Sequence, residues 1–284
     1  MTQIVFKLAI AWLLAFSSFQ SAGAEEPIRT MSFNIRYGKA NDGDNHWRTR
    51  HQLVLKTIKD YKPDLLGTQE TLNFQAEYLQ KNLPKYASFG RSREKDPNQG
   101  EQCTVFYLKS RFELLDKGQF WLSEKPEEIG SKSWDSSLPR IATWVKLKDR
   151  SNKRTFIFLN THFDHRGKVA RHESAKLIAR RVAEFKLPTI ITGDFNSGEN
   201  SDPYKALVKN RMTEILDSFR AKYPEKQKGE GTFNSWRGTD SGARIDWVLS
   251  TSEFDVKQAA INKFNENGKY PSDHFPVTAS LQFK

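Results

Sequence analysis

The sequence has very little cysteine and no long apolar segment. Cys103 is the only cysteine in 284 residues, so the chain cannot form an intramolecular disulfide, and we expect no redox function. The apolar run from about Leu8 to Phe16 is shorter than the roughly 20 residues that cross a bilayer. Internal repeats and low-complexity linkers are absent after residue 24, which predicts one large domain over residues 25–284.

Several common catalytic motifs are missing as well. The sequence contains no G-x-x-x-x-G-K-[ST], no complete G-x-G-x-x-G and no G-x-S-x-G, the signatures of P-loop, dinucleotide-binding and α/β-hydrolase enzymes. The stretch "HESAK" at 172–176 begins like a zinc-protease helix, but Lys176 stands where the second histidine is required. Structural zinc sites need cysteines or closely spaced histidines as ligands, and the strand-end residues singled out below provide neither.

Residues 1–24 have the pattern of a secretory signal peptide. Lys7 precedes the apolar run, and small residues lead to Ala22-Gly23-Ala24, an A-x-A cleavage site. The alternative interpretation is an uncleaved anchor. We expect cleavage before Glu25, export to the periplasm or the extracellular space, and no stable membrane insertion afterwards. No cysteine lies near the cleavage site, which argues against a lipid-modified amino terminus.

The chain is basic, with 45 Lys and Arg against 34 Asp and Glu and a net charge of +11. A basic surface favours polyanions or anionic small molecules, although solvated lysines can also simply keep an exported protein soluble. The basic residues are scattered and form no tail, so charge alone does not identify a nucleic-acid-binding protein. Nothing in the sequence predicts a protein partner.

Apolar runs of strand length dominate the pattern after residue 24. Helical spacing is limited chiefly to residues 48–61, 71–83 and 168–185, and the polar stretch at 148–153 between two strand-like runs predicts a hairpin turn. Many strands with few helices predict a mixed α/β sandwich instead of a strictly alternating βαβ fold.

Polar residues gather at the ends of the predicted strands. Four runs carry them at the carboxyl end and two at the start: Asn34, Glu70, His162 and the pair Asp194 and Asn196, then Asp246 and the pair Asp273 and His274. If these groups meet at one edge, the last two strands run antiparallel to the first four. That arrangement excludes a fully parallel doubly wound sheet and suits two packed mixed sheets with helices outside.

The stretch "LPTIITGDFNSG" at 187–198 is the most informative. Asp194 and Asn196 lie two residues apart at the end of a β-branched strand, so their side chains point to the same side. Singly, most of the strand-end residues have simple explanations as turn, helix-start or structural residues. Together, carboxylate and amide oxygens suit Mg²⁺, and with histidines nearby they indicate metal-assisted hydrolysis of a phosphate ester.

In this order, Asn34, "QE" with Glu70, "TH" with His162, "GDFN", "RID" with Asp246 and "SDH" resemble the endonuclease/exonuclease/phosphatase superfamily. The resemblance covers nearly all of residues 25–284. "SFNIRYG" and "GQFWLSEKPE" also resemble an exported bacterial branch close to the deadenylase-like proteins. Membership implies a four-layer α/β/β/α sandwich of two mixed β-sheets flanked by helices.

The resemblance also implies roles for the site residues. It assigns Asn34, Glu70 and Asp273 to a Mg²⁺ ion, with Mn²⁺ as the alternative. Two residues act on the attacking water: His274 polarises or deprotonates it, and Asp194 positions it. Asn196 donates to the phosphoryl oxygens, and His162 contacts the phosphate or protonates the leaving oxygen. Asp246 orients His274 or the phosphate contacts. Abasic-site members use tyrosine in place of His162, which argues against that specialisation. Arg140 is a candidate phosphate clamp, because a guanidinium matches phosphate in bidentate fashion; a surface ion pair is the simpler interpretation.

These inferences predict an exported Mg²⁺-dependent phosphoesterase, with diester cleavage ahead of monoester cleavage. Nucleic acid, a lipid headgroup and a sugar phosphate all stay open as substrates, so a small-substrate phosphatase is the alternative. A non-catalytic binding protein of the same fold is the other rival, and the complete set of site residues argues against it. Substrate choice is expected in the rim loops, whose tryptophans either stack on substrate or pack in the core: Trp47, Trp121, Trp134 and Trp236.

Overall fold

A computed structural model describes residues 26–210 and 212–284. The predicted signal peptide at 1–24 lies outside these residues. The elements follow one another as β1 (Ile28–Asn34), η1 (Gly43–Asn45), α1 (Trp47–Tyr61), β2 (Leu65–Thr71), α2 (Asn73–Asn82), β3 (Tyr86–Phe89), β4 (Gln102–Leu108), β5 (Phe112–Trp121), β6 (Ile141–Asp149), β7 (Thr155–His162), α3 (Lys168–Phe185), β8 (Thr189–Asp194), α4 (Asp202–Val208), β9 (Ile215–Asp217), α5 (Ser218–Lys222), β10 (Asp246–Thr251), β11 (Phe254–Ile261) and β12 (Val277–Phe283). No helix within the described ranges is long and apolar enough to cross a membrane.

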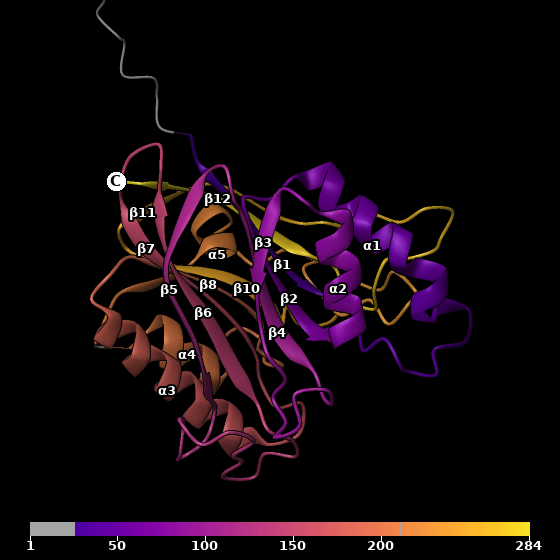
Figure 1. Ribbon diagram of the computed structural model, residues 1–284, viewed down its shortest axis with the longest axis horizontal. Helices are drawn as coiled ribbons and strands as arrows, with labels where there is room; N and C mark the ends of the chain where they lie inside the picture. The colour runs from indigo at the N-terminus through magenta and orange to yellow at the C-terminus, as the bar shows by residue number, and fades with distance from the viewer. Residues whose placement is uncertain (1–25, 211) are drawn as a thin grey trace, which may run out of the picture.

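The strands form two six-stranded mixed sheets (Figure 1). Their orders are β11-β12-β1-β2-β4-β3 and β5-β6-β7-β8-β10-β9. In the centre of each sheet two strands run parallel, β1 with β2 and β7 with β8. The late strands β12 and β10 run antiparallel to β1 and β8. The predicted reversal of the last two site-bearing strands is therefore confirmed.

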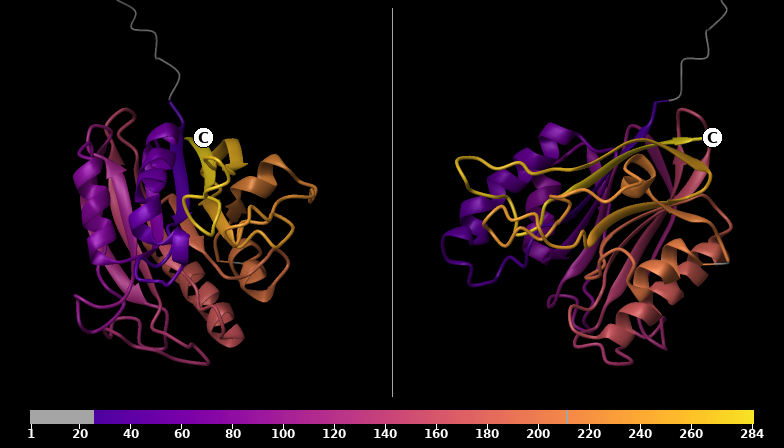
Figure 2. Two further views of the ribbon diagram at one scale, coloured as in Figure 1. Left: turned by 90° about the vertical axis from the view of Figure 1, so that its right-hand side faces the viewer. Right: turned by 180° about the vertical axis from the view of Figure 1, so that it is seen from behind.

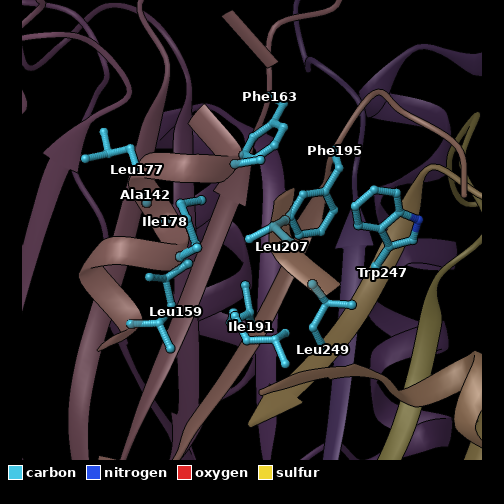
Figure 3. Close-up of a cluster of buried hydrophobic side chains, with 14 of the residues drawn as sticks. Ala142, Leu159, Phe163, Leu177, Ile178, Ile191, Phe195, Leu207, Trp247 and Leu249 are labelled. Carbon is cyan, nitrogen blue, oxygen red and sulfur yellow. The ribbon is translucent and has the colours of Figure 1, made fainter. Parts of the chain in front are cut away.

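Three layers of apolar side chains hold the sandwich together. Met31, Phe33 and Ile58 belong to a core between the first sheet and its helices. A second core, which includes Leu65 and Phe158, lies between the two sheets. The third packs α3 and α4 against the second sheet (Figure 3), and Figure 2 shows the helices outside both sheets. The predicted four-layer α/β/β/α sandwich is confirmed.

A buried polar network also joins the sheets near the edge that carries the site. The Asn160 amide on β7 donates to the carbonyl oxygens of Thr68 at 2.9 Å and Thr104 at 3.1 Å. Its Oδ1 accepts from Gln69 at 2.6 Å and from Thr192 at 3.0 Å. Because buried polar groups are costly unless they are paired, this network fixes the offset of one sheet against the other. Strand ends from both sheets are thereby held in register.

The expected helices and hairpin are found, but the edge strand β11 and several shorter elements were not predicted. The helix at 168–185 matches α3, and a turn joins β6 to β7. The strand β11 was missed because it is an edge strand that exposes Asp255 and other polar residues. Among the rim tryptophans, Trp47 and Trp121 are buried and belong to packing instead of to a stacking surface.

Candidate active site

Strand alternation delivers the site residues to one edge of the sandwich. Asp194 and Asp246 are register partners at the ends of β8 and β10. Phe195 follows Asp194 and Trp247 follows Asp246, so both rings point to the opposite face, where they stack with 4.3 Å between their centroids. The apolar stack anchors the backbone while the two carboxylates face the site. The same period-2 logic that predicted Asp194 and Asn196 on one side therefore operates in the structure.

Asn34 ties the first sheet to the second. Its Nδ2 donates to Glu70 Oε1 at 3.1 Å and to Asp194 Oδ2 at 2.9 Å. Its Oδ1 faces the other way and accepts from the backbone N–H of Arg36 at 2.9 Å. In this arrangement Asn34 orients the two carboxylates, and a role as an oxygen ligand to a metal would require its amide to turn over.

Glu70 stands in an unusual backbone conformation. Its φ is +57°, in the left-handed region that residues other than glycine seldom adopt. Its Oε2 accepts from the N–H of Tyr37 at 2.7 Å. Burial raises the pKa of Glu70, but His274, Asn34 and Arg36 outweigh burial and lower it below its ordinary value. Glu70 is therefore an ionised carboxylate, as a hard cation requires.

His274 and Asp246 form a buried pair. The His274 Nδ1 lies 2.9 Å from Asp246 Oδ2, and the other Asp246 oxygen has no hydrogen-bond partner among the described residues. Burial would lower the pKa of His274, but the charges of Asp246, Asp194 and Asp273 raise it well above its ordinary value. The imidazole therefore holds a proton tightly, with its Nε2 3.8 Å from Asp194 Oδ2.

Asp194 is the central carboxylate of the site. Burial and the charge of Asp246 raise the pKa of Asp194 to about 7, against the lowering effect of His274. Its Oδ1 accepts from the N–H of Asn196 at 2.9 Å, and its Oδ2 lies 3.4 Å from His162 Nε2. A carboxylate with a pKa near neutrality, beside a histidine that holds a proton, is suited to exchange protons with a bound water.

His162 faces hydrogen-bond donors at both ring nitrogens. Arg140 Nη1 lies 3.2 Å from Nδ1, and Asn196 Nδ2 lies 3.0 Å from Nε2. Burial and the charges of Arg140 and Arg93 lower the pKa of His162 well below its ordinary value. A neutral imidazole can accept at only one nitrogen, so one contact is left mismatched. An anionic oxygen beside Nε2 would resolve the mismatch by accepting from both His162 and Asn196.

Arg140 is buried, and its guanidinium joins two histidines. Only 4% of the residue is exposed, and its Nε lies 3.4 Å from Asp164 Oδ2 while its Nη2 lies 2.9 Å from His165 Nδ1. Asp164 in turn accepts from the N–H of Gly167 at 2.8 Å. Arg140 is thus a built part of the site, and the surface ion pair considered from the sequence does not apply.

The carboxylates fit a hard divalent cation. Two groups, Glu70 with His162 and Asp194, and Asp194 with Asp246 and His274, each offer ligand atoms within 4.8 Å of one another. The pKa of Asp273 is raised, first by burial and also by the negative charge of Glu70. Carboxyl groups that repel one another in this way mark an excess of negative charge, which a divalent cation would offset.

These side chains line one cavity of about 620 Å³. All nine residues singled out from the sequence lie in or directly beside it: Asn34, Glu70, Arg140, His162, Asp194, Asn196, Asp246, Asp273 and His274. Sequence reasoning missed Arg36, Glu101, His165 and Phe233, which also line the cavity. Arg36 lies within the quoted stretch "SFNIRYG" and His165 lies three residues after His162, so their proximity in sequence to site residues was a signal.

A family model described as the endonuclease/exonuclease/phosphatase family matches residues 31–274. The chain belongs to this family. Its members hydrolyse phosphate esters, so the chain is a phosphoesterase by family and the cluster of acid, amide and histidine groups is its candidate active site; the superfamily expected from the motifs is confirmed.

Solved structures agree with this assignment. A family member from Bacteroides vulgatus is 34% identical, with a TM-score of 0.85 over 92% of this chain and 100% of its own. A mannosyl-6-phosphatase from Bacteroides thetaiotaomicron is 32% identical, with a TM-score of 0.81 over 90% of this chain and 100% of its own. Among curated proteins, Nocturnin from Rattus norvegicus is 24% identical over 92% of this chain and 67% of its own length.

Proposed function

We propose that the protein is an exported, Mg²⁺-dependent phosphatase that acts on small phosphate monoesters, with sugar phosphates as the preferred class. The observation that carries this proposal is the convergence of His162, Asn196, Asp194 and His274 on one cavity. A cavity of about 620 Å³ has the volume of a small-molecule site. The phosphodiesterase expected from the sequence, with nucleic acid as one of its open substrates, becomes the second candidate.

The charges around the cavity suit a phosphate group. Arg140 lies beside His162 and His165, and Arg36 lies near Glu70 and Asp273, so positive groups flank two sides of the acidic centre. Phosphate oxygens are strong acceptors and favour guanidinium and imidazole donors. The aromatic ring of Phe233, which is 46% exposed, offers a face to an organic leaving group at the rim.

Each protein group then has a role in hydrolysis. Glu70 and Asp273 would hold the Mg²⁺, which supplies charge stabilisation for the phosphoryl oxygens when it is bound. Asp194 accepts the proton of the attacking water, the protonated His274 polarises that water, and Asp246 holds the His274 ring through Nδ1. His162 Nε2–H and Asn196 Nδ2 donate to the phosphoryl oxygens, and the leaving oxygen takes its proton from solvent water.

The relatives support the choice of substrate class. The match to the mannosyl-6-phosphatase has 32% identity and spans the whole of that protein's chain, whereas the match to Nocturnin has 24% identity and spans 67% of its length. The nuclease alternative has its own support, because another relative, at 22% identity, is the 3'-5'-exoribonuclease subunit of the yeast CCR4-Not complex. A net charge of +11 is also compatible with RNA.

A substrate panel tests this proposal. The purified protein is incubated with Mg²⁺ and mannose 6-phosphate, glucose 6-phosphate, bis-p-nitrophenyl phosphate, sphingomyelin, plasmid DNA or poly(A) RNA. We expect the highest kcat/KM on a sugar phosphate, with release of inorganic phosphate, and loss of that activity in His274→Ala. Faster cleavage of poly(A) RNA than of every monoester would overturn the proposal in favour of a nuclease.

A further inference from the structure

Arg36 occupies an unexpected position beside the carboxylates assigned to the metal. Its Nε lies 3.6 Å from Asp273 Oδ2, and its Nη1 lies 3.9 Å from Glu70 Oε2. Both distances are too long for hydrogen bonds, although they are short enough for strong attraction between charges. A guanidinium therefore stands just outside contact with the two acids that would bind a divalent cation.

Asp42 accounts for this separation. It accepts two hydrogen bonds from Arg36, from Nε at 3.0 Å and from Nη2 at 2.9 Å. Such a bidentate pair fixes the plane of a guanidinium as well as its distance. Asp42 thus keeps the Arg36 charge from closing onto Glu70 and Asp273.

The backbone of Arg36 is held as firmly as its side chain. Its φ of +60° is uncommon for a residue with a side chain. Its carbonyl oxygen accepts from Gln75 Nε2 at 3.0 Å and from Arg50 Nη2 at 3.1 Å. Its N–H donates to Asn34 at 2.9 Å. An unfavourable conformation that so many partners maintain is typical of a residue at a functional site.

We propose that Arg36 is a tethered counter-ion that sets the divalent-cation affinity of the active site, and that Asp42 controls how strongly it competes. Without metal, the guanidinium offsets part of the negative charge of Glu70 and Asp273. When a divalent cation binds, the same guanidinium repels it, and the Asp42 tether limits the repulsion. This inference rests on the proposed metal role of Glu70 and Asp273.

Substitution of Arg36 and substitution of Asp42 should therefore change the Mg²⁺ affinity in opposite directions, although the two residues form one ion pair. Arg36→Gln removes the competing charge and should tighten Mg²⁺ binding by about tenfold, a moderate factor because the side chain is 31% exposed and partly neutralised by Asp42. Asp42→Asn frees Arg36 to approach Glu70 and Asp273, so it should weaken Mg²⁺ binding several-fold.

Calorimetric Mg²⁺ titration of the metal-free protein, without substrate, measures both effects. Two exposed residues nearby, Arg48 and Asp44, make no hydrogen bond or ion pair with Arg36, so Arg48→Gln and Asp44→Asn control for the change of net charge. Thermal melts establish that each variant is folded. They should also show a larger Mg²⁺-induced rise in Tm for Arg36→Gln than for the wild type.

The double variant separates competition by Arg36 from direct attraction between Asp42 and the metal. If Asp42 acts through Arg36, Asp42→Asn has no effect on Mg²⁺ affinity in the Arg36→Gln background. Weaker or unchanged binding in Arg36→Gln, or an Asp42→Asn effect that persists in the double variant, would overturn the inference. Absence of Mg²⁺ binding in the wild type would instead remove the metal role on which the inference and the proposed function both rely.

Discussion

Replacing Asp246 by asparagine isolates the charge that acts on His274. Asp246 is 1% exposed and His274 is 5% exposed, and Asp246 Oδ2 lies 2.9 Å from His274 Nδ1. The second Asp246 oxygen has no hydrogen-bond partner among the described residues. The carboxylate charge therefore acts mainly on His274 and on the neighbouring Asp194, and it raises the pKa of both. Asparagine keeps the shape of the side chain and removes this charge.

The expected loss is large in rate and small in metal affinity. Asparagine no longer stabilises a protonated His274, and an N–H of its amide turned toward Nδ1 would hold the wrong tautomer. Proton transfer by a positioned side chain contributes about 10²–10⁴-fold to rate, so kcat should fall within that range, equivalent to about 3–5 kcal/mol. Asp246 is outside the Glu70–Asp273 pair, so Mg²⁺ affinity should change by less than about threefold, or about 0.7 kcal/mol.

Phosphate release under saturating Mg²⁺ gives kcat and KM, and calorimetry gives the metal affinity. The matched control is Asp255→Asn, which removes an equal charge from an exposed position of the edge strand β11, where Asp255 forms an ion pair with Lys257. The control should keep wild-type kcat. An Asp246→Asn enzyme with more than a tenth of wild-type kcat, or one restored by added Mg²⁺, would refute the reasoning.

Three further predictions concern stability, substrate and processing. Burial raises the pKa of Glu199, but Arg220 and Arg244 outweigh it and lower that pKa, so the stability it confers is present above about pH 4.5 and is lost as pH falls below that value. Glu199→Gln should then cost about 3 kcal/mol in urea unfolding at pH 7 and less at pH 3.5, and an equal loss at both pH values would contradict this. If RNA were the substrate, its affinity should fall steeply with salt, whereas sugar phosphate turnover should depend on salt only weakly; kinetics at 50 and 200 mM salt, concentrations at which nucleic-acid affinities differ by orders of magnitude, distinguish the two. Exported protein should begin at Glu25, and an intact mass that retains Met1 would exclude signal cleavage.

The sequence predicted the sandwich because each strand and its polar end can be recognised within one short stretch of residues. Apolar runs of strand length that end in Asn34, His162 and Asp194 indicate both where a strand lies and which end of it is polar. Once the polar ends are required to meet, the reversed direction of β10 and β12 follows. The strand β11 carries no such signal, because an exposed edge alternates polar and apolar residues irregularly.

The parts of the site that the sequence did not reveal depend on contacts between distant segments. The sequence "LPRIATW" left Arg140 open as a phosphate clamp or a surface ion pair, and only the fold shows that His162, Asp164 and His165 surround it. Arg36 is similar, since its proximity to Asp273 depends on the pairing of β1 with β12. Local patterns predict which face a residue takes, but they do not predict which remote residue it meets.

Mg²⁺-dependent release of phosphate from mannose 6-phosphate, compared among wild type, Glu70→Gln and His274→Ala, tests the central claim most directly. We predict no release in the presence of a chelator, partial recovery of Glu70→Gln at high Mg²⁺, and no recovery of His274→Ala at any Mg²⁺ concentration. Equal release by the wild type with and without the chelator would contradict the account. Rescue of His274→Ala but not of Glu70→Gln would show that the two roles are reversed.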